Sequence, residues 1–295
     1  MSIFLSDEVS QALAAGRPVV ALESAVLTHG LPPEWGRQAV VSQFEACRAE
    51  SAVPALVAVQ DGRLRIGLTT QECDRLIDTP AAKVSPWNLA AVLLDPGQGG
   101  TTVAATVRAA GLCGIRVVAT GGLGGVHPGP GNDVSADLGE LERQPVCVVC
   151  AGPKSTLNAA ATLERLETAG VPVIGWRSDR LAGFLAHTCD LPLSTRIDDL
   201  TELASLLNQH WTLGGRGAVL SQPLPAELAL EPEALHAAGE HGRQAADEPL
   251  DSGPGRTPAE LRRLQQRLGE RALRANLTLL ERNARLAAAL ARALV

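Results

Sequence analysis

The chain of 295 residues is long enough to bury a large core, and 45% of its residues are hydrophobic against 20% charged, a balance that excludes disorder over most of its length. A net charge of −6 and an aromatic content of 2% argue against nucleic-acid binding, which favours basic surfaces and stacking side chains. No charge-free apolar run approaches the roughly 18 residues that span a bilayer, and the first residues lack a basic region followed by an apolar core. We therefore expect a cytoplasmic protein with no membrane partner.

Apolar runs and helical periods alternate along the chain. Short runs rich in Val, Ile and Ala are followed by longer segments of helical spacing, which predicts the α/β fold class, with a mainly parallel sheet covered by helices. Strands are predicted at Val19–Leu22, Pro54–Gln60, Arg63–Leu68, Ala91–Leu94, Ile115–Ala119, Val146–Ala151 and Val171–Ile174. Helices are predicted at Glu34–Ala49, Thr102–Ala110, Ser155–Ala169 and Asp198–His210.

One compositional break separates these elements from the C-terminus. Residues 223–256 are rich in Pro, Gly and Ala, and acidic residues outnumber basic ones, which predicts a short helix and a mobile acidic connector. We therefore expect a single domain over residues 1–295. Thr257-Pro-Ala-Glu260 then carries a hydroxyl cap and a proline at the first helical position. Leucines at helical spacing predict amphipathic helices over 257–293, interrupted at Gly269, that pack on the sheet or on a partner subunit.

The six cysteines are scattered through mostly apolar segments, which favours reduced, buried thiols. Cys147 and Cys150 form a C-x-x-C pattern, but they lie in a predicted buried strand, where residues three apart point to opposite faces. The pattern therefore predicts two core residues and not a redox or zinc site.

Only two of the 26 basic residues are lysines, Lys83 and Lys154. Compositional drift would explain two surface lysines equally well. However, arginine stays protonated, whereas lysine can lose its proton when desolvated and attack a carbonyl carbon. Lys154 lies in Ala151-Gly-Pro-Lys-Ser-Thr-Leu157, between a predicted buried strand and a predicted helix. This position favours an activated amine.

Three other segments follow predicted strands, where open α/β sheets bind their ligands. Glu23 ends the first strand and is a candidate acid or base, although a solvated strand end is the commoner explanation. Residues 97–103 bring glycines and hydroxyls to a helix start, where backbone amides suit an anion. Residues 120–133 contain six glycines and His127, and Asp137 follows; a binding loop and a flexible turn explain them equally well. Together these segments offer an amine, a carboxylate, backbone amides for an anion and a carboxylate for a hard metal ion. Such groups suit a phosphorylated carbonyl or sugar substrate.

Seven segments, in order along the chain, closely resemble the pseudouridine-5′-phosphate glycosidase family, also called the indigoidine synthase A family. They are Ala21-Leu-Glu-Ser-Ala-Val-Leu-Thr-His-Gly-Leu-Pro32, Lys83-Val-Ser85, Gly100-Thr-Thr-Val-Ala-Ala-Thr106, Thr120-Gly-Gly-Leu-Gly-Gly-Val-His127, Asp133-Val-Ser-Ala-Asp-Leu138, Val149-Cys-Ala-Gly-Pro-Lys-Ser155 and Ala275-Asn-Leu-Thr-Leu-Leu-Glu-Arg-Asn-Ala-Arg285. The resemblance extends from about residue 5 to the C-terminus. It departs from the family pattern in a shorter loop between His127 and Asp133 and in a poor match from Pro232 to Gly255.

The resemblance implies reversible cleavage of the C–C glycosidic bond of pseudouridine 5′-phosphate, which gives uracil and ribose 5-phosphate. It also implies a divalent cation, usually Mn²⁺, a homotrimer, and a three-layer α/β/α fold around a large mixed, mainly parallel sheet. By position in the motifs, Lys154 would be the nucleophile, Glu23 the proton donor and Asp133 the metal ligand. The implied substrate-binding residues are Lys83, Val103, Thr120, His127, Ser135, Ala136, Asp137 and Asn276.

A C-glycoside has no lone pair on its leaving atom, so the paired-carboxylate mechanism of ordinary glycosidases does not apply. After ribose ring opening, Lys154 would hold C1′ as an imine while Glu23 protonates the uracil carbon or the ring oxygen. Lys83 would hold the phosphate as a point charge. The low aromatic content predicts aliphatic or Gly-rich walls around uracil.

Three alternatives stay open at this point. A different imine-forming lyase or aldolase would use Lys154 in the same way on a phosphorylated sugar. A nucleotide-binding or regulatory protein would only hold a phosphate in the loop from Gly121 to Gly131. The leucine-rich C-terminal helices would also suit an assembly module, but most of the seven segments lie outside them.

Overall fold

The computed structural model describes the chain except for residues 1–2, 130–132, 232, 236–262 and 264–265. In this described part, eleven strands form one mixed sheet in the order β1-β4-β3-β2-β7-β8-β13-β9-β12, and β6 and β5 extend it from β3. The strands are β1 (Ile3–Leu5), β2 (Val19–Leu22), β3 (Val53–Gln60), β4 (Arg63–Ile66), β5 (Ala81–Val84), β6 (Gln98–Thr101), β7 (Val117–Ala119), β8 (Cys147–Cys150), β9 (Val173–Trp176), β12 (Thr195–Ile197) and β13 (Ala218–Ser221). A separate antiparallel pair is made by β10 (Arg180–Gly183) and β11 (Ala186–Pro192).

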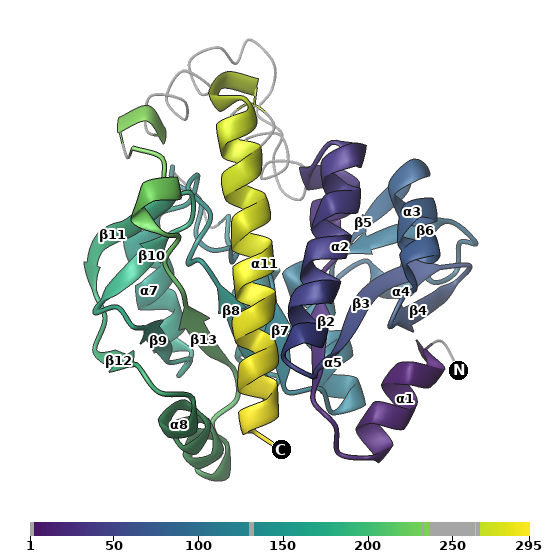
Figure 1. The fold of residues 1–295 in the computed structure, drawn as a ribbon, viewed down its shortest axis with the longest axis horizontal. Helices are drawn as coiled ribbons and strands as arrows, with labels where there is room; N and C mark the ends of the chain where they lie inside the picture. The colour runs from purple at the N-terminus through teal and green to yellow at the C-terminus, as the bar shows by residue number, and fades with distance from the viewer. Residues whose placement is uncertain (1–2, 130–132, 232, 236–262, 264–265) are drawn as a thin grey trace.

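Helices cover both faces of the sheet (Figure 1). One face carries α2 (Pro33–Ala49), α3 (Thr70–Asp78), α8 (Leu200–Thr212) and α11 (Glu270–Ala293). The other carries α1 (Asp7–Ala14), α5 (Val103–Cys113), α6 (Ala136–Leu141) and α7 (Ala159–Thr168). Short elements in the described part of the chain include a π-helix η1 (Val26–Gly30), α4 (Leu89–Val92) and a 3-10 helix η2 (Ala226–Leu228). The predicted α/β/α layering and the large mixed sheet are confirmed.

The centre of the sheet is parallel from β3 through β2, β7, β8, β13 and β9, whereas β4 and β6 run antiparallel to β3. Parallel neighbours place their carboxyl ends at one edge, which is where ligands bind in open α/β sheets. The strands of this centre are buried on both faces because helices cover both sides. Cys147 and Cys150 confirm the pattern, since they belong to the two core clusters on opposite faces of β8.

The structure corrects three sequence-based expectations. Ala91–Leu94 is not a strand, because its apolar run continues a short helical turn, α4; periodicity cannot separate the two in so short a run. Residues 98–101, expected in the loop before a helix, form β6 against β3, and α5 starts after the Thr102 cap. The helix expected from Ser155 begins only at Ala159, because the Asn158 side chain caps it by accepting from Ala161 N–H at 3.0 Å.

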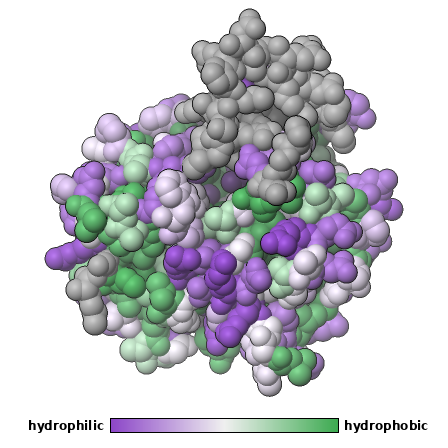
Figure 2. Space-filling model, turned by 180° about the vertical axis from the view of Figure 1, so that it is seen from behind, coloured by the Kyte–Doolittle hydropathy of each residue, from purple (hydrophilic) through white to green (hydrophobic). Residues whose placement is uncertain are grey.

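Hydrophobic and hydrophilic side chains are both exposed on the face turned away from the view of Figure 1 (Figure 2). Among the described residues, no helix combines the length and the apolar character needed to cross a bilayer.

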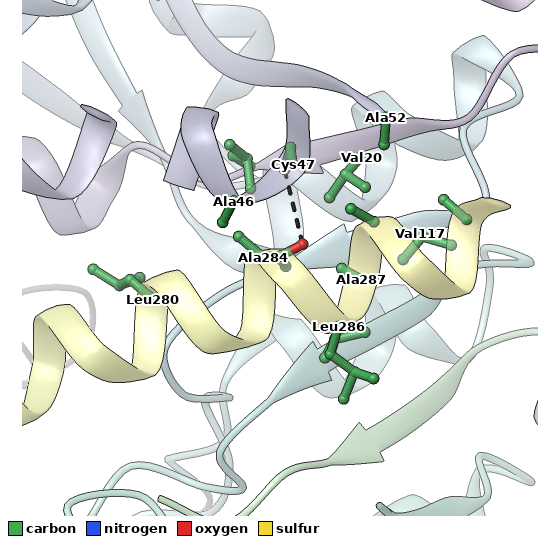
Figure 3. Close-up of a cluster of buried hydrophobic side chains, with 14 of the residues drawn as sticks. Val20, Ala46, Cys47, Ala52, Val117, Leu280, Ala284, Leu286 and Ala287 are labelled. Carbon is green, nitrogen blue, oxygen red and sulfur yellow. Dashed lines mark hydrogen bonds between the residues drawn. The ribbon is translucent and has the colours of Figure 1, made fainter. Parts of the chain in front are cut away.

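The C-terminal helix α11 crosses the middle of the molecule (Figure 1) and packs on β2, β7, β8 and α2. Small residues allow the close approach: Ala284 and Ala287 are fully buried, and the Cys47 thiol of α2 donates to Ala284 O at 3.8 Å (Figure 3). The break predicted at Gly269 is confirmed, because this residue has a φ of 62° at the start of α11. Most of the helix predicted before it, and residues 236–256 of the predicted connector, lie outside the described residues.

Candidate active site

Every residue predicted for the site lines one cavity of about 260 Å³. It opens at the carboxyl edge of the sheet, where Glu23 follows β2, Thr120 follows β7 and the segment with Lys154 follows β8. The chain thus brings together side chains from segments far apart in sequence. The predicted residues on its wall are Glu23, Lys83, Val103, Thr120, His127, Asp133, Ser135, Ala136, Asp137, Lys154 and Asn276.

Glu23 is a buried carboxylic acid, 6% exposed. Its Oε2 accepts from Val26 N–H at 2.9 Å, and its Oε1 accepts from the Thr120 hydroxyl at 3.3 Å. Burial raises the pKa of Glu23, and the positive charge of Lys154 partly opposes that rise. A raised pKa keeps a carboxyl group protonated closer to neutral pH, so Glu23 can donate a proton. The simple explanation of a solvated strand end is wrong.

The two lysines of the chain share this cavity. Burial, together with the charge of Lys154, lowers the pKa of Lys83 to about 8. Lys154 lies in a turn after β8, where its N–H donates to Leu123 O at 3.0 Å, and not at a helix start as expected. The negative charges of Asp137 and Glu23 oppose this lowering of the Lys83 pKa in part, because they stabilise the protonated amine. The cavity therefore holds two amines close to two carboxylates.

Asp137 ties the wall of the cavity together. The side chain is 4% exposed, and its two oxygens accept from Ala104 N–H and Gly124 N–H, both at 2.8 Å. A Cβ at position 124 would lie 2.6 Å from Asp137 Oδ2, so only glycine allows this approach. Asp137 thus joins the start of α5 to the glycine loop. The Ala104 amide, one residue beyond the segment 97–103 that was expected to bind an anion, is occupied by this bond.

The cavity is also lined by residues outside the predicted set, and three of them carry rings: His29, Trp87 and Phe184. His29 lies on the π-helix η1, a rare element that occurs frequently at functional sites, and its Nδ1 is 2.6 Å from Thr28 Oγ1. Phe184 is 2% exposed and has a φ of 60°, whereas the Trp87 side chain is 71% exposed. Two aromatic side chains therefore stand on the cavity wall, and aliphatic or Gly-rich walls around uracil itself stay a prediction. His29 lies within the segment Ala21–Pro32, Trp87 lies two residues after Lys83-Val-Ser85, and Phe184 lies outside all seven segments.

Asp133 lies on the wall at the point predicted for a metal ion, beside His127, whose N–H donates to Asp133 O at 2.9 Å. Among the described residues, no three His, Cys, Asp or Glu side chains gather to hold a metal. Magnesium-like cations commonly use one or two carboxylates and complete their shell with water and substrate phosphate. One carboxylate facing a cavity fits such a site, but it does not form a closed protein cage.

Comparison with known proteins decides the family. Residues 8–293 match the family model described as indigoidine synthase A like protein. The chain belongs to this family. Two relatives of the family, both named pseudouridine-5′-phosphate glycosidase, come from Thermus thermophilus and Gemmatimonas aurantiaca. The first is 47% identical over 94% of this chain and 98% of its own, and the second is 44% identical over 98% and 95%.

The family fold is also seen in a solved structure. The crystal structure of the prealnumycin C-glycosynthase in complex with ribulose 5-phosphate has a TM-score of 0.90 to this chain and 34% sequence identity, and it covers 99% of this chain and 96% of its own. The resemblance inferred from the seven segments is therefore confirmed at the level of family and fold.

Proposed function

We propose that this protein is a pseudouridine-5′-phosphate glycosidase that cleaves the C–C bond between uracil and ribose 5-phosphate reversibly. The observation that carries the proposal is the meeting of Lys154 with the buried acid Glu23 in one cavity. The names of the relatives support the substrate, and a neighbour that is a C-glycosynthase in complex with a sugar phosphate supports the bond type.

Lys154 would act as the nucleophile. Its neutral amine forms a bond to C1′ while the C1′–O4′ bond breaks, and O4′ takes a proton and stays on C4′ as a hydroxyl. The attached nitrogen loses a proton, which restores its lone pair. The nitrogen lone pair then assists cleavage of the C1′–C5 bond, and the electron pair of that bond stays on uracil C5, which is protonated. The resulting iminium is hydrolysed by water to ribose 5-phosphate and the free amine. The overall reaction consumes one water molecule and is a hydrolysis.

Glu23 would supply the proton for ring opening or for uracil C5. Its burial and its bond from Thr120 hold the acid in place within the cavity. Lys83 would bind the phosphate as a cation, and the glycine loop fixed by Asp137 would allow the sugar phosphate to approach the backbone. The remaining substrate contacts would come from five other residues of the cavity wall: Val103, His127, Ser135, Ala136 and Asn276.

We also propose that Asp133 holds a divalent cation, Mn²⁺ in the first instance, with water and substrate oxygens as its other ligands. When bound, such an ion neutralises negative charge on the phosphorylated substrate. A homotrimer is proposed for the assembly, and light scattering after size exclusion tests it.

Product analysis tests the function. Purified protein with Mn²⁺ and pseudouridine 5′-phosphate is expected to release uracil and ribose 5-phosphate in equal amounts, and Lys154→Gln is expected to release neither. Cleavage of simple sugar phosphates without uracil release would instead indicate an imine-forming lyase or aldolase. Substrate binding without any turnover would indicate a binding or regulatory protein.

A further inference from the structure

Asn283 is a polar residue in an apolar setting. It lies on α11, is 1% exposed, and is flanked on the helix by the buried residues Leu280, Ala284 and Leu286. Burying an amide among hydrophobic side chains costs free energy unless the amide is hydrogen-bonded. Its bonds should therefore indicate what it does.

The side-chain hydrogen bonds of Asn283 are donated by its Nδ2 to the backbone that follows β7. Its Nδ2 donates to Thr120 O at 2.8 Å and to Gly121 O at 3.4 Å. On the other side, Thr120 N–H donates to Val149 O at 3.1 Å and Gly121 O accepts from Ala151 N–H at 2.9 Å. The backbone at Thr120 and Gly121 is thus held between β8 and the C-terminal helix.

Thr120 links the backbone held by Asn283 to the cavity. Its hydroxyl donates to Glu23 Oε1 at 3.3 Å, and the same residue lines the cavity wall. Within the described part of the chain, the wall includes Thr120 and Gly121 but not Asn283. The side chain of Asn283 therefore reaches the cavity through its hydrogen bonds to the backbone of these two residues.

We propose that Asn283 is a positioning residue for the proton donor: it fixes the carbonyls of Thr120 and Gly121 and so keeps the Thr120 hydroxyl directed at Glu23. The inference rests on the proposed function, because that function makes Glu23 the acid. It assigns a role in the reaction to a residue that does not touch the cavity.

The bond from Thr120 lowers the pKa of Glu23, against the effect of burial, which raises it. Loss of this bond should therefore raise that pKa further and shift the alkaline fall of kcat to higher pH. The other charged or titratable groups that face Glu23 or line its cavity are not substituted in an Asn283 variant. They are Lys154, Asp137, Lys83, His29, His127 and Asp133.

Asn283→Leu removes the donor at similar volume, and Asn283→Ser is a smaller variant in case leucine impairs folding. Gln43→Leu is the matched control: Gln43 is 2% exposed and its Nε2 donates to Ala39 O of its own helix at 2.9 Å. We expect both Asn283 variants to lower kcat by about 10- to 100-fold, as a small misplacement of a reacting group does. KM should change by less than about threefold, since ground-state binding is kept.

A double-mutant cycle with Thr120→Val tests the route. If Asn283 acts through Thr120, the double variant loses kcat by about as much as the worse single variant. If the fold-losses in kcat of the two single variants multiply in the double variant, the inference about Asn283 is overturned while the proposed function stands. The same follows if the Asn283 variants have a kcat no lower than that of Gln43→Leu at equal folded fraction. A wild-type protein that releases no uracil would overturn the proposed function, and the inference with it.

Discussion

At the residue scale, the surroundings of Lys83 predict a pH dependence. Lys83, buried beside the charge of Lys154, has its pKa lowered to about 8. Below that pH it is a cation that can hold a phosphate, and above it the amine is neutral. The second proton of a phosphate monoester titrates near pH 6, so the phosphate is already doubly charged around pH 8, where Lys83 titrates.

The KM for pseudouridine 5′-phosphate is therefore expected to rise as the pH is raised through about 8, because the charge of Lys83 is lost there. Lys83→Arg is expected to flatten this rise, since arginine stays protonated. Initial rates over pH 6.5 to about 9.5 measure both profiles. An equal rise of KM in wild type and Lys83→Arg would show that another group titrates.

The residues of the site could be predicted where a motif directly follows a strand, as at Glu23 and Thr120. The carboxyl ends of parallel strands lie at one edge of the sheet, so such residues meet there. Phe184 could not be predicted. It comes from the turn between β10 and β11, with a φ of 60°. Its place in the cavity depends on a tertiary contact, since a Cβ on Gly122 would lie 2.5 Å from the Phe184 ring.

At the element scale, the misplaced boundaries have local causes. The helix α7 begins late because Asn158 supplies its cap and Asn158 N–H donates to Val126 O at 2.8 Å, which holds the preceding residues outside the helix. The strand β6 reads as a loop because Gly99 and Gly100 have no side chains to indicate a strand. Glycine is needed there, since a Cβ on Gly99 would lie 2.5 Å from Val84 Cγ2.

Helix α11 depends on small residues at its contact with α2 and the sheet. Ala284→Leu is expected to destabilise the fold by about 1–3 kcal/mol, because extra methylenes in a close-packed core force neighbouring side chains and backbone to move. Urea unfolding followed by circular dichroism measures the change. Ala293→Leu, at an exposed position on the same helix, should leave the unfolding midpoint nearly unchanged; equal losses in the two variants would contradict this packing.

At the scale of the whole molecule, the parallel centre of the sheet could be predicted because its buried strands are continuous apolar runs, as at Val146–Ala151. The outer strands could not. β1 and β12 are each three residues long, and the β12 sequence Thr-Arg-Ile has no extended apolar pattern. Their pairing depends on neighbours that are distant in sequence, which a local pattern does not report. The prediction of the site does not depend on these outer strands, because the site lies at the carboxyl edge of the central parallel strands.

We propose that Lys154 forms a covalent bond to the sugar in a cavity that also holds Glu23 and a second lysine. The most direct test is borohydride reduction of the protein during turnover of pseudouridine 5′-phosphate, followed by peptide mass spectrometry. We expect a ribose-phosphate adduct on the peptide that contains Lys154, and its loss in Lys154→Arg. Uracil release with the adduct on Lys83 instead, or with no adduct in any peptide, would show that Lys154 is not the nucleophile.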